Sequence, residues 1–551
     1  MPQHVRTLLA IGLSLAIFYL WFRFIAPAPQ PRPPAASAPS AVSAPPPAPT
    51  APLPMPAPAD SAIADPQADL PETLTVVTTK YLRVELTNVG AAARRILLTQ
   101  YRQGTGQHLA DLVTDAQDAP LTIAGDAVAG RIPKDAHFAM ERPSPLQVVY
   151  RWRGNGIDVQ KIYRLTEDSY LIDVDIAVKA IEATPMQGRI GLEVNATNAP
   201  PRHAGFFAFL HGPPDLWGAV SALDGKVTRI PAAQAGASQE LVGSVAWGGV
   251  ESRYYLLAML PRGRTSQSAV RLHGGPEGSA GASRARLAVM GAPVAIPPGQ
   301  SVTESFSVYL GPKQLETLRA AGANLERAID YGWFGFAAIP LLRLLKLFYQ
   351  LAHNYGVAII LLTLFIKLLL HPITKASMRS MRKMQALQPR IKELREKYKS
   401  DSQRLNAETM QLFRTHGVNP MGGCLPMLLQ IPVYIALYKV LWNAIELYRA
   451  PFFGFYRDLS APDPYFVAPI LLGIAFFLQQ KLTPSPSADP MQQKIMLIMP
   501  VMFTAFMIFL PSGLVLYILV NTLFSVLQQW LMNRGLGFRD LLRGNLKPRP
   551  V

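Results

Sequence analysis

Residues 359–370 read IILLTLFIKLLL, an apolar run interrupted by a single charge, Lys367. Together with their neighbours they form an apolar segment over residues 355–372, which is long enough to cross a lipid bilayer as a helix. A lysine at the centre of a membrane helix costs on the order of 2.5–3.5 kcal/mol of insertion free energy. The segment therefore predicts an α-helical membrane protein that carries a charge inside one of its spans.

Two interpretations of Lys367 are open. Its ammonium can reach toward the cytoplasmic headgroups, because Pro372 at the end of the span is only five residues away. Alternatively, it lies in a polar groove open to the cytoplasm, and the polar residues in the predicted spans favour this second interpretation. The candidates for the lining are Thr363, Gln430, Asn521, Thr522 and Ser525, with Gln528 as a further polar residue. No Asp or Glu occurs in any predicted span, so the ammonium is available to an acidic group from another protein.

Five further apolar segments are predicted to cross the membrane. They cover residues 7–26, 421–442, 465–482, 495–510 and 513–532. The first, within an N-terminal unit 1–26, is either an uncleaved anchor or a cleaved signal peptide. Prolines crowd the small-residue site at Ala26 and the run is long for a signal peptide, so an anchor is favoured. The prediction is a core of five spans over residues 355–533 plus this anchor, six in all.

The distribution of charge predicts the orientation. The formal net charge is +17, but residues 26–330 contain 27 Lys/Arg and 27 Asp/Glu, so the excess lies in the remainder, where most of the predicted spans are. The segment 374–416 has eleven Lys/Arg against four acidic residues, and the tail 534–551 has five against one. Positive loops stay in the cytoplasm, which places both termini inside. The neutral domain carries no basic patch of the kind that nucleic-acid binding needs, so no sequence-specific nucleic-acid contact is predicted.

The exported part is predicted to be a β-domain on a tether. Residues 27–70 are rich in Pro and Ala and should form an extended linker. From there to residue 312 apolar and polar residues alternate, most clearly in the run that begins at Tyr170 and ends at Val178. Such a period of two indicates strands with one buried and one wet face. We expect an antiparallel β-sandwich over residues 71–312.

Two helical features flank the second span. Within residues 313–354, the stretch 332–350 has apolar residues at helical spacing, with Arg343 and Lys346 opposite them, which predicts an amphipathic helix in the membrane interface. The segment 374–416 has a Met-rich apolar stripe and a second, shorter one, which predict a basic helical hairpin on the cytoplasmic side. The Met stripe either packs the two helices together or also contacts nascent apolar segments and partner proteins.

Residue types that support other chemistries are missing. The chain has one cysteine, Cys424, so it can form neither an internal disulfide framework nor a cysteine zinc cluster. It contains no phosphate-binding Gly-x-x-x-x-Gly-Lys-Ser/Thr loop and no His-Glu-x-x-His zinc motif. We therefore predict no covalent catalysis, no metal and no cofactor. The lack of carboxylates in the spans argues against an ion-coupled transporter, which normally needs them.

Several short motifs resemble the YidC/Oxa/Alb family of membrane insertases, between residues 331 and 537. They are NYGVAII at 354–360 leading to Lys367, HPITKA at 371–376, LQP at 387–389, NPMGGCLP at 419–426, QIP at 430–432 and SGLVLY at 512–517. The anchor, linker and β-domain resemble the Gram-negative YidC form.

This resemblance implies an insertase and chaperone of the inner membrane, working alone or with the Sec translocon on nascent membrane-protein clients. It implies that Lys367 is the groove charge that receives the hydrophilic part of a client, although many family members have arginine there. It also implies an apolar route from the groove into the lipid bilayer. By motif position, that route includes Cys424, Leu425, Pro426, Pro432, Met502, Phe503 and Phe506. Contact of the hairpin and the basic tail with ribosomes is left open.

Two other functions remain as alternatives. Lys367 would also suit a secondary transporter for an anionic solute, which uptake by purified vesicles would reveal. The β-domain would also suit a scaffold for membrane complexes. Deletion of most of the β-domain separates that function from insertion, because an insertase centred on the spans should survive the deletion.

Overall fold

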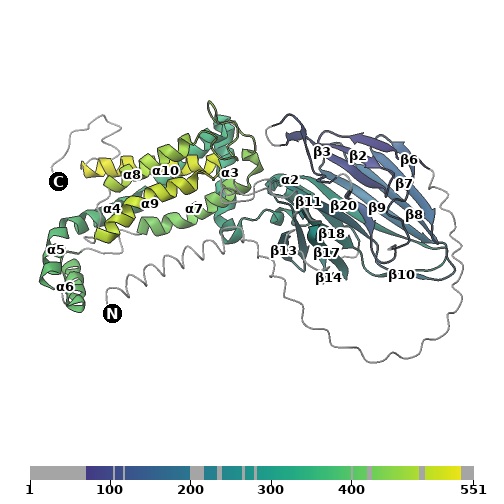
Figure 1. Cartoon of the computed structure of the whole chain (residues 1–551), viewed down its shortest axis with the longest axis horizontal. Coiled ribbons are helices and arrows are strands. Elements are labelled where there is room, and N and C mark those ends of the chain that lie inside the picture. Colours follow the sequence, from purple (N-terminus) through teal and green to yellow (C-terminus); the bar gives the residue numbers. More distant parts are fainter. Residues whose placement is uncertain are drawn as a thin grey trace, which may run out of the picture.

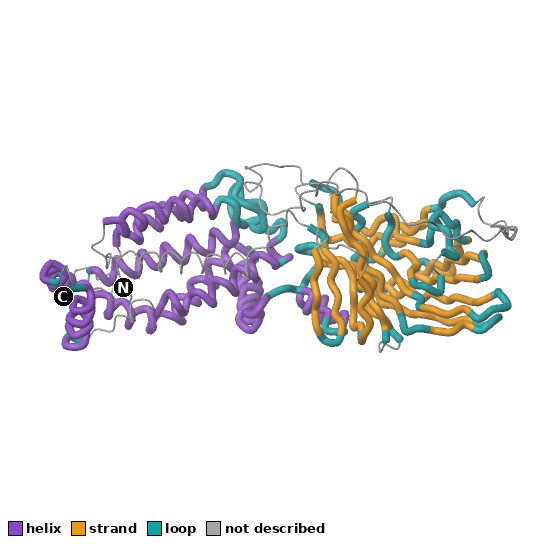
Figure 2. The backbone as a smooth tube through the Cα atoms, turned by 60° about the horizontal axis from the view of Figure 1, so that its bottom comes forward, coloured by secondary structure: helices purple, strands orange, loops and turns teal. Residues whose placement is uncertain are grey.

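The computed structural model describes residues 70–103, 106–115, 118–128, 130–198, 216–231, 239–263, 267–277, 282–398, 401–417, 425–482 and 490–534. The predicted anchor at 7–26, nearly all of the linker 27–70, Cys424 and the tail from residue 535 onward lie outside these residues. A β-rich domain and a bundle of helices follow one another along the long axis of the molecule (Figures 1 and 2).

The β-rich domain is antiparallel at every strand pairing found in the part of the chain that the structure describes. Its strands are β1 (Leu74–Thr78), β2 (Leu82–Thr87), β3 (Ala92–Arg102), β4 (Leu109–Asp111), β5 (Thr122–Ala124), β6 (Ala139–Ser144), β7 (Gln147–Gly154), β8 (Ile157–Leu165), β9 (Leu171–Ala180), β10 (Met186–Gly188), β11 (Gly191–Asn198), β12 (Gly218–Leu223), β13 (Lys226–Pro231), β14 (Gln239–Gly243), β15 (Val245–Glu251), β16 (Tyr255–Pro261), β17 (Ser268–Glu277), β18 (Ala282–Met290), β19 (Val294–Ile296) and β20 (Ser301–Pro312).

These strands form one large sheet and three smaller ones. The nine-stranded sheet has the order β13-β12-β15-β16-β20-β9-β8-β7-β6, and the five-stranded sheet has the order β14-β17-β18-β11-β5. Strands β1 to β4 form a further sheet in chain order, and β10 pairs with β19. The two larger sheets pack face to face through β15 and β18. The antiparallel β-domain predicted from the alternation is confirmed.

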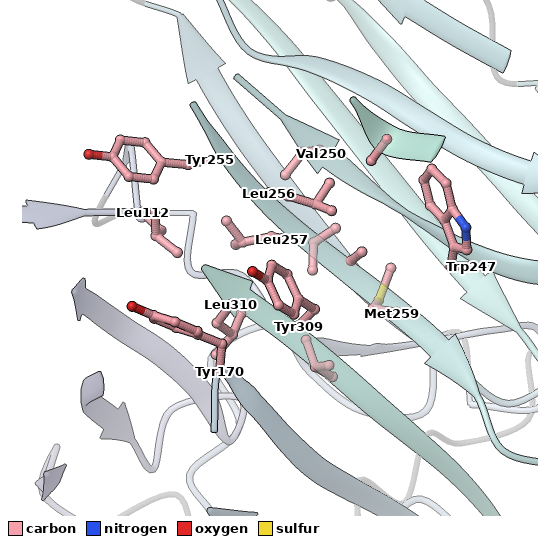
Figure 3. Packing of buried hydrophobic residues seen from close by; sticks show 14 of the residues in the cluster. Leu112, Tyr170, Trp247, Val250, Tyr255, Leu256, Leu257, Met259, Tyr309 and Leu310 are labelled. Atoms are coloured by element: carbon pink, nitrogen blue, oxygen red, sulfur yellow. The ribbon is translucent and has the colours of Figure 1, made fainter. Parts of the chain in front are cut away.

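The buried face of β9 and β20 shows why the alternation predicts the sheet. Ile172, Val174 and Ile176 are buried, whereas the residues between them are partly exposed. Side chains of successive strand residues point to opposite faces, so a period of two places one apolar set in the core. Tyr170 and Tyr309 meet in this core with ring centroids 6.2 Å apart, beside residues of β16 (Figure 3).

Helices predominate in the described chain after the β-rich domain. They are α2 (Leu315–Ala321), η3 (Leu325–Ala328), η4 (Gly332–Phe334), α3 (Gly335–Ala352), α4 (Tyr355–Ala386), α5 (Gln388–Lys397), α6 (Ser402–Thr415), α7 (Leu425–Asn443), η6 (Ile445–Leu447), α8 (Val467–Leu482), α9 (Pro490–Met507) and α10 (Ser512–Asn533). By length and composition, Gly332–Ala352, Tyr355–Ser380 and Ser512–Asn533 could each cross a membrane, and Val467–Leu482 and Ile498–Met507 are shorter apolar helices. The count of six spans stays a prediction.

Helix α3 crosses the end of the bundle nearest the β-rich domain, rather than running along it (Figures 1 and 2). It buries Ala338, Leu342 and Leu345 against α4 and α7. Trp333 just before it is 96% exposed. A helix that crosses the end of a bundle and presents an aromatic ring outward suits the membrane interface. Its placement therefore supports the amphipathic helix predicted over 332–350, although its length alone would also allow a span.

Helix α4 does not end at Pro372, where the apolar segment ends. It continues as one helix to Ala386, and the break comes at Leu387, ahead of Pro389 at the start of α5. The predicted stripe from residue 378 to 398 is thus divided between α4 and α5. Proline fits the first turn of a helix, where its missing N–H needs no partner, so Pro389 favours a new start. Leu387 and Ile391 pack against α6, which fixes the turn.

The hairpin predicted over 374–416 consists of α5 and α6, which pack together beyond the end of α4 (Figure 1). The Asp401 side chain accepts a hydrogen bond from the Arg404 N–H at 3.0 Å and so caps α6. An Asp at this position satisfies one of the N–H groups left free at the start of a helix.

The β-rich domain contacts the bundle through the turn between β15 and β16. There Arg253 Nε donates to the Trp442 carbonyl oxygen at 2.7 Å, and the guanidinium lies 4.0 Å from the centre of the indole ring. The rings of Tyr254 and Tyr448 lie 4.9 Å apart beside them. This contact holds the end of α7 against the β-rich domain.

Ion pairs reinforce the same junction. Lys346 of α3 lies 2.5 Å from Glu316 of α2 and 2.7 Å from Glu446 of η6. Lys439 of α7 pairs with Asp330 at 3.3 Å. One cation thus links three elements, and the second ties α7 to the segment that leads into α3.

Candidate functional site

Lys367 lies on α4, half-buried within the bundle. Its Nζ donates a hydrogen bond to the Ser525 Oγ of α10 at 2.8 Å. Ser525 in turn donates to the Asn521 carbonyl oxygen of its own helix at 2.8 Å. Among the residues described, no carboxylate forms an ion pair with Lys367. The ammonium is therefore held by a neutral hydroxyl.

The Lys367–Ser525 bond is one of four side-chain hydrogen bonds that join α10 to α4 and α7. The α10 residues are spaced by four, four and three positions, so they lie on one face of the helix. We call these pairs the polar seam: Tyr517 with Gln430, Asn521 with Tyr434, Ser525 with Lys367, and Gln528 with His371. The first two pairs join α10 to α7 and the last two join it to α4. The polar seam therefore links three helices through hydrogen bonds between polar side chains.

Three of the five predicted lining residues belong to the polar seam, namely Gln430, Asn521 and Ser525. The other two point their hydroxyls back to their own helices. Thr363 Oγ1 donates to the Ile359 carbonyl at 2.7 Å and Thr522 Oγ1 donates to the Ile518 carbonyl at 2.7 Å. Both threonines are at least 98% buried, so they line no open surface in this arrangement.

Sequence reasoning did not single out three members of the polar seam: Tyr434, Tyr517 and His371. His371 follows Lys367 by four residues, and this helical spacing was the signal that could have found it. The two tyrosines gave no such signal, because a tyrosine in an apolar span is equally suited to plain packing.

The predicted apolar route lies on exposed surface where the structure describes it. On α9, the side chains of Met502, Phe503 and Phe506 are 59%, 44% and 37% exposed. Helix α9 packs on α8, which leaves this face uncovered. Pro432 of α7 is half-buried. Leu425 and Pro426 begin α7, but their side chains, like Cys424 as a whole, lie outside what is described.

The site offers charge and apolar surface rather than reactive groups. No cluster of three or more His, Cys, Asp or Glu side chains that could hold a metal ion occurs in the described ranges. The groups near Lys367 are hydroxyls, amides and an imidazole, which can bind an acidic group without breaking a bond.

Two family models together match most of the chain. Residues 74–344 match the model described as "YidC periplasmic domain", and residues 347–538 match the model "60Kd inner membrane protein". A membrane protein insertase YidC from Syntrophus aciditrophicus is 39% identical over 478 residues, which are 84% of this chain and 85% of that protein. The chain belongs to the YidC family of membrane protein insertases. One from Geobacter metallireducens is 36% identical over 475 residues, 84% of this chain and 86% of that protein.

One solved structure is also similar to this chain. A crystal structure of an active YidC insertase with its first transmembrane domain resolved is 19% identical, with a TM-score of 0.37, and the match covers 85% of this chain and 95% of that one. The family membership confirms the resemblance, the fold class and the insertase function predicted above. It also gives this YidC-family chain an inner-membrane location and a periplasmic β-domain.

Proposed function

We propose that this chain inserts membrane-protein clients through a hydrophilic groove along the polar seam, open to the cytoplasm, in which Lys367 attracts the acidic part of the client. The observation that carries the proposal is the Lys367 ammonium inside the helices, where the Ser525 hydroxyl is its one hydrogen-bond partner among the described residues. A client carboxylate would supply the missing negative charge and form a charge-assisted hydrogen bond. The lysine ammonium is a point charge, whereas the guanidinium of arginine is planar and binds a carboxylate through two parallel hydrogen bonds. Lys367 therefore favours acidic tails in general and does not require one fixed orientation of the carboxylate.

The apolar part of the client would leave along α7 and α9. In this proposal Met502, Phe503 and Phe506 form, with Cys424, Leu425, Pro426 and Pro432 of the α7 region, a path between groove and lipid. Apolar residues such as Leu gain roughly 0.3–0.6 kcal/mol each at the centre of a membrane helix. A span of ~20 such residues then gains several kcal/mol. That gain is large enough to draw a short acidic tail across without covalent catalysis or a cofactor.

The basic segments would set orientation and partners. Residues 374–416 and 534–551 are strongly basic, which supports cytoplasmic placement of both termini, with an anchor at 1–26 and a linker at 27–70 leading to the periplasmic domain. The same charges suit contact with the ribosome. Helices α7 and α9, which expose apolar side chains to the bilayer, suit the handover of clients from the Sec translocon.

The test is client insertion into liposomes by Lys367→Arg, Lys367→Ala and Lys367→Glu variants. Arginine keeps the charge and should insert normally. Alanine should impair clients with acidic tails, and glutamate should impair them most, because it repels the tail. Lys439→Ala is the matched control, since this lysine lies at the outer end of α7 and pairs with Asp330. Equal insertion by the three Lys367 variants would remove the residue from the mechanism.

A further inference from the structure

His371 lies four residues after Lys367 on α4, about 6 Å further along the helix and on the same face. Its Nδ1 is 3.3 Å from the Gln528 Nε2 of α10, and Gln528 follows the lysine's partner Ser525 by three residues. The imidazole is half-buried, and its Nε2 has no hydrogen-bond partner among the residues described. Two nitrogen-bearing side chains of α4 therefore stand one turn apart against the same face of α10.

We propose that His371 is a second anion-binding residue of the groove, which acts with Lys367 to select client tails that carry two carboxylates. This inference rests on the groove proposed above and adds a specificity to it. One carboxylate would bind the Lys367 ammonium, and the other would accept a hydrogen bond from the His371 Nε2.

The contact with Gln528 leaves the other ring nitrogen of His371 available as a donor. When Nδ1 accepts the Gln528 N–H, the imidazole carries its proton on Nε2. That N–H can donate a hydrogen bond to a carboxylate.

The described helices packed against α4 bring no carboxylate to His371. Helix α10 has no Asp, Glu, His, Lys or Arg between Ser512 and Asn533. The charged or titratable residues on the neighbouring elements are Tyr517 on α10, Tyr434, Tyr438 and Lys439 on α7, Arg343, Lys346, Tyr349 and His353 at α3, Tyr355, Lys367, Lys375, Arg379, Arg382 and Lys383 on α4 itself, and Arg390, Lys392, Glu393, Arg395, Glu396 and Lys397 on α5. Helix α5 joins α4 at Leu387, about four turns beyond the imidazole. Within the part of the chain that the structure describes, the ring is therefore left available to an anion from a client.

The experiment compares two clients that differ by one carboxylate. Full-length protein in liposomes inserts single-span clients whose translocated tails carry one or two acidic residues. The readout is the ratio of the two-acid rate to the one-acid rate.

The wild-type ratio should be about three- to tenfold higher than the ratio for His371→Leu, which is the range that one added hydrogen bond to a charged group supports. His371→Lys should keep the high ratio. His416→Leu in the cytoplasmic hairpin is the matched control and should behave as wild type. A His371→Leu ratio as high as that of wild type, or a His371→Lys ratio as low as that of His371→Leu, would overturn the proposal.

Lys367→Ala in the same assay separates the two proposals. If this variant inserts the one-acid client as well as wild type does, the charged groove itself is wrong. If it is impaired while the His371 variants leave the ratio unchanged, the groove stands and the second site is refuted.

Discussion

Lys367 Nζ and Ser525 Oγ are 2.8 Å apart although 158 residues separate them in the chain. Ser525 is itself fixed by its bond to the Asn521 carbonyl. The hydroxyl thus orients the ammonium without neutralising it. A client carboxylate can replace such a partner at little cost, whereas it would have to compete with an acidic one.

The bond between these two residues should be measurable in the stability of the bundle. The shift in thermal midpoint caused by Lys367→Met and Ser525→Ala together, in detergent micelles, should differ from the sum of the shifts caused by each variant alone. Because a hydrogen bond to a charged group contributes about 1.5–3 kcal/mol, we expect a coupling free energy of about 1 kcal/mol or more in a double-mutant cycle. Thr522→Ala, whose hydroxyl donates within α10, should be additive with Lys367→Met. Additivity for Ser525 as well would contradict the bond.

A buried lysine in the periplasmic domain predicts a pH-dependent stability. Lys161 is fully buried, donates to the Ala91 and Leu121 carbonyls, and burial lowers its pKa well below the ordinary lysine value. The unfolded chain then binds a proton that the folded domain releases, so wild-type stability rises with pH between the folded and unfolded pKa values, by up to about 1.4 kcal/mol per pH unit. Lys161→Met should flatten this rise.

Urea unfolding of the full chain, followed by tryptophan fluorescence between about pH 7 and pH 10, measures this effect. The advantage of Lys161→Met over wild type should be largest at the low end of the range. Lys179→Met, an exposed site on the adjacent strand β9, should leave the pH dependence as in wild type. Parallel curves for wild type and Lys161→Met would show that Lys161 is protonated to the same extent in both states.

Arg253 should control how firmly the periplasmic domain holds the end of α7. Lysine can neither donate from Nε to the Trp442 carbonyl nor stack as a planar group on its ring, and such cation–π contacts contribute roughly 0.5–2 kcal/mol. Arg253→Lys should therefore speed hydrogen exchange in residues 444–450. Arg151→Lys, in an exposed pair with Glu141, is the control. Unchanged exchange in 444–450 would mean that the contact contributes nothing to the junction.

The two acidic partners of Lys346 should differ in their contributions to stability. The Glu446 side chain is 8% exposed and that of Glu316 is 55% exposed. Glu446→Gln should lower the free energy of unfolding by on the order of 2–3 kcal/mol. The loss should be smaller than for a fully unpaired Lys346 ammonium, because Glu316 still pairs with it. Glu316→Gln should cost less than about 1 kcal/mol, because water screens an exposed pair. Calorimetry of the two variants in micelles checks the order, and equal losses would contradict it.

The fold class could be read from local pattern. Alternation such as that from Tyr170 to Val178 predicts strands because burial of one face repeats every second residue, and Asp401 predicts a helix start because its carboxylate caps free N–H groups. The end of α4 could not be read this way. Proline has the same local preferences at Pro372 and Pro389, and packing of Leu387 and Ile391 on α6 decided where the helix breaks.

The sequence by itself determined that Lys367 is a charge in an apolar span without a carboxylate on any predicted span, because both facts depend only on residue types along the chain. Only the tertiary structure decided its surroundings. In the folded bundle Lys367 donates to the neutral hydroxyl of Ser525, and His371 lies within hydrogen-bond distance of Gln528. The Thr363 hydroxyl donates to a carbonyl of its own helix. The reason is that side-chain partners across a bundle depend on the rotation and depth of each helix, and helix–helix packing sets these over the whole bundle.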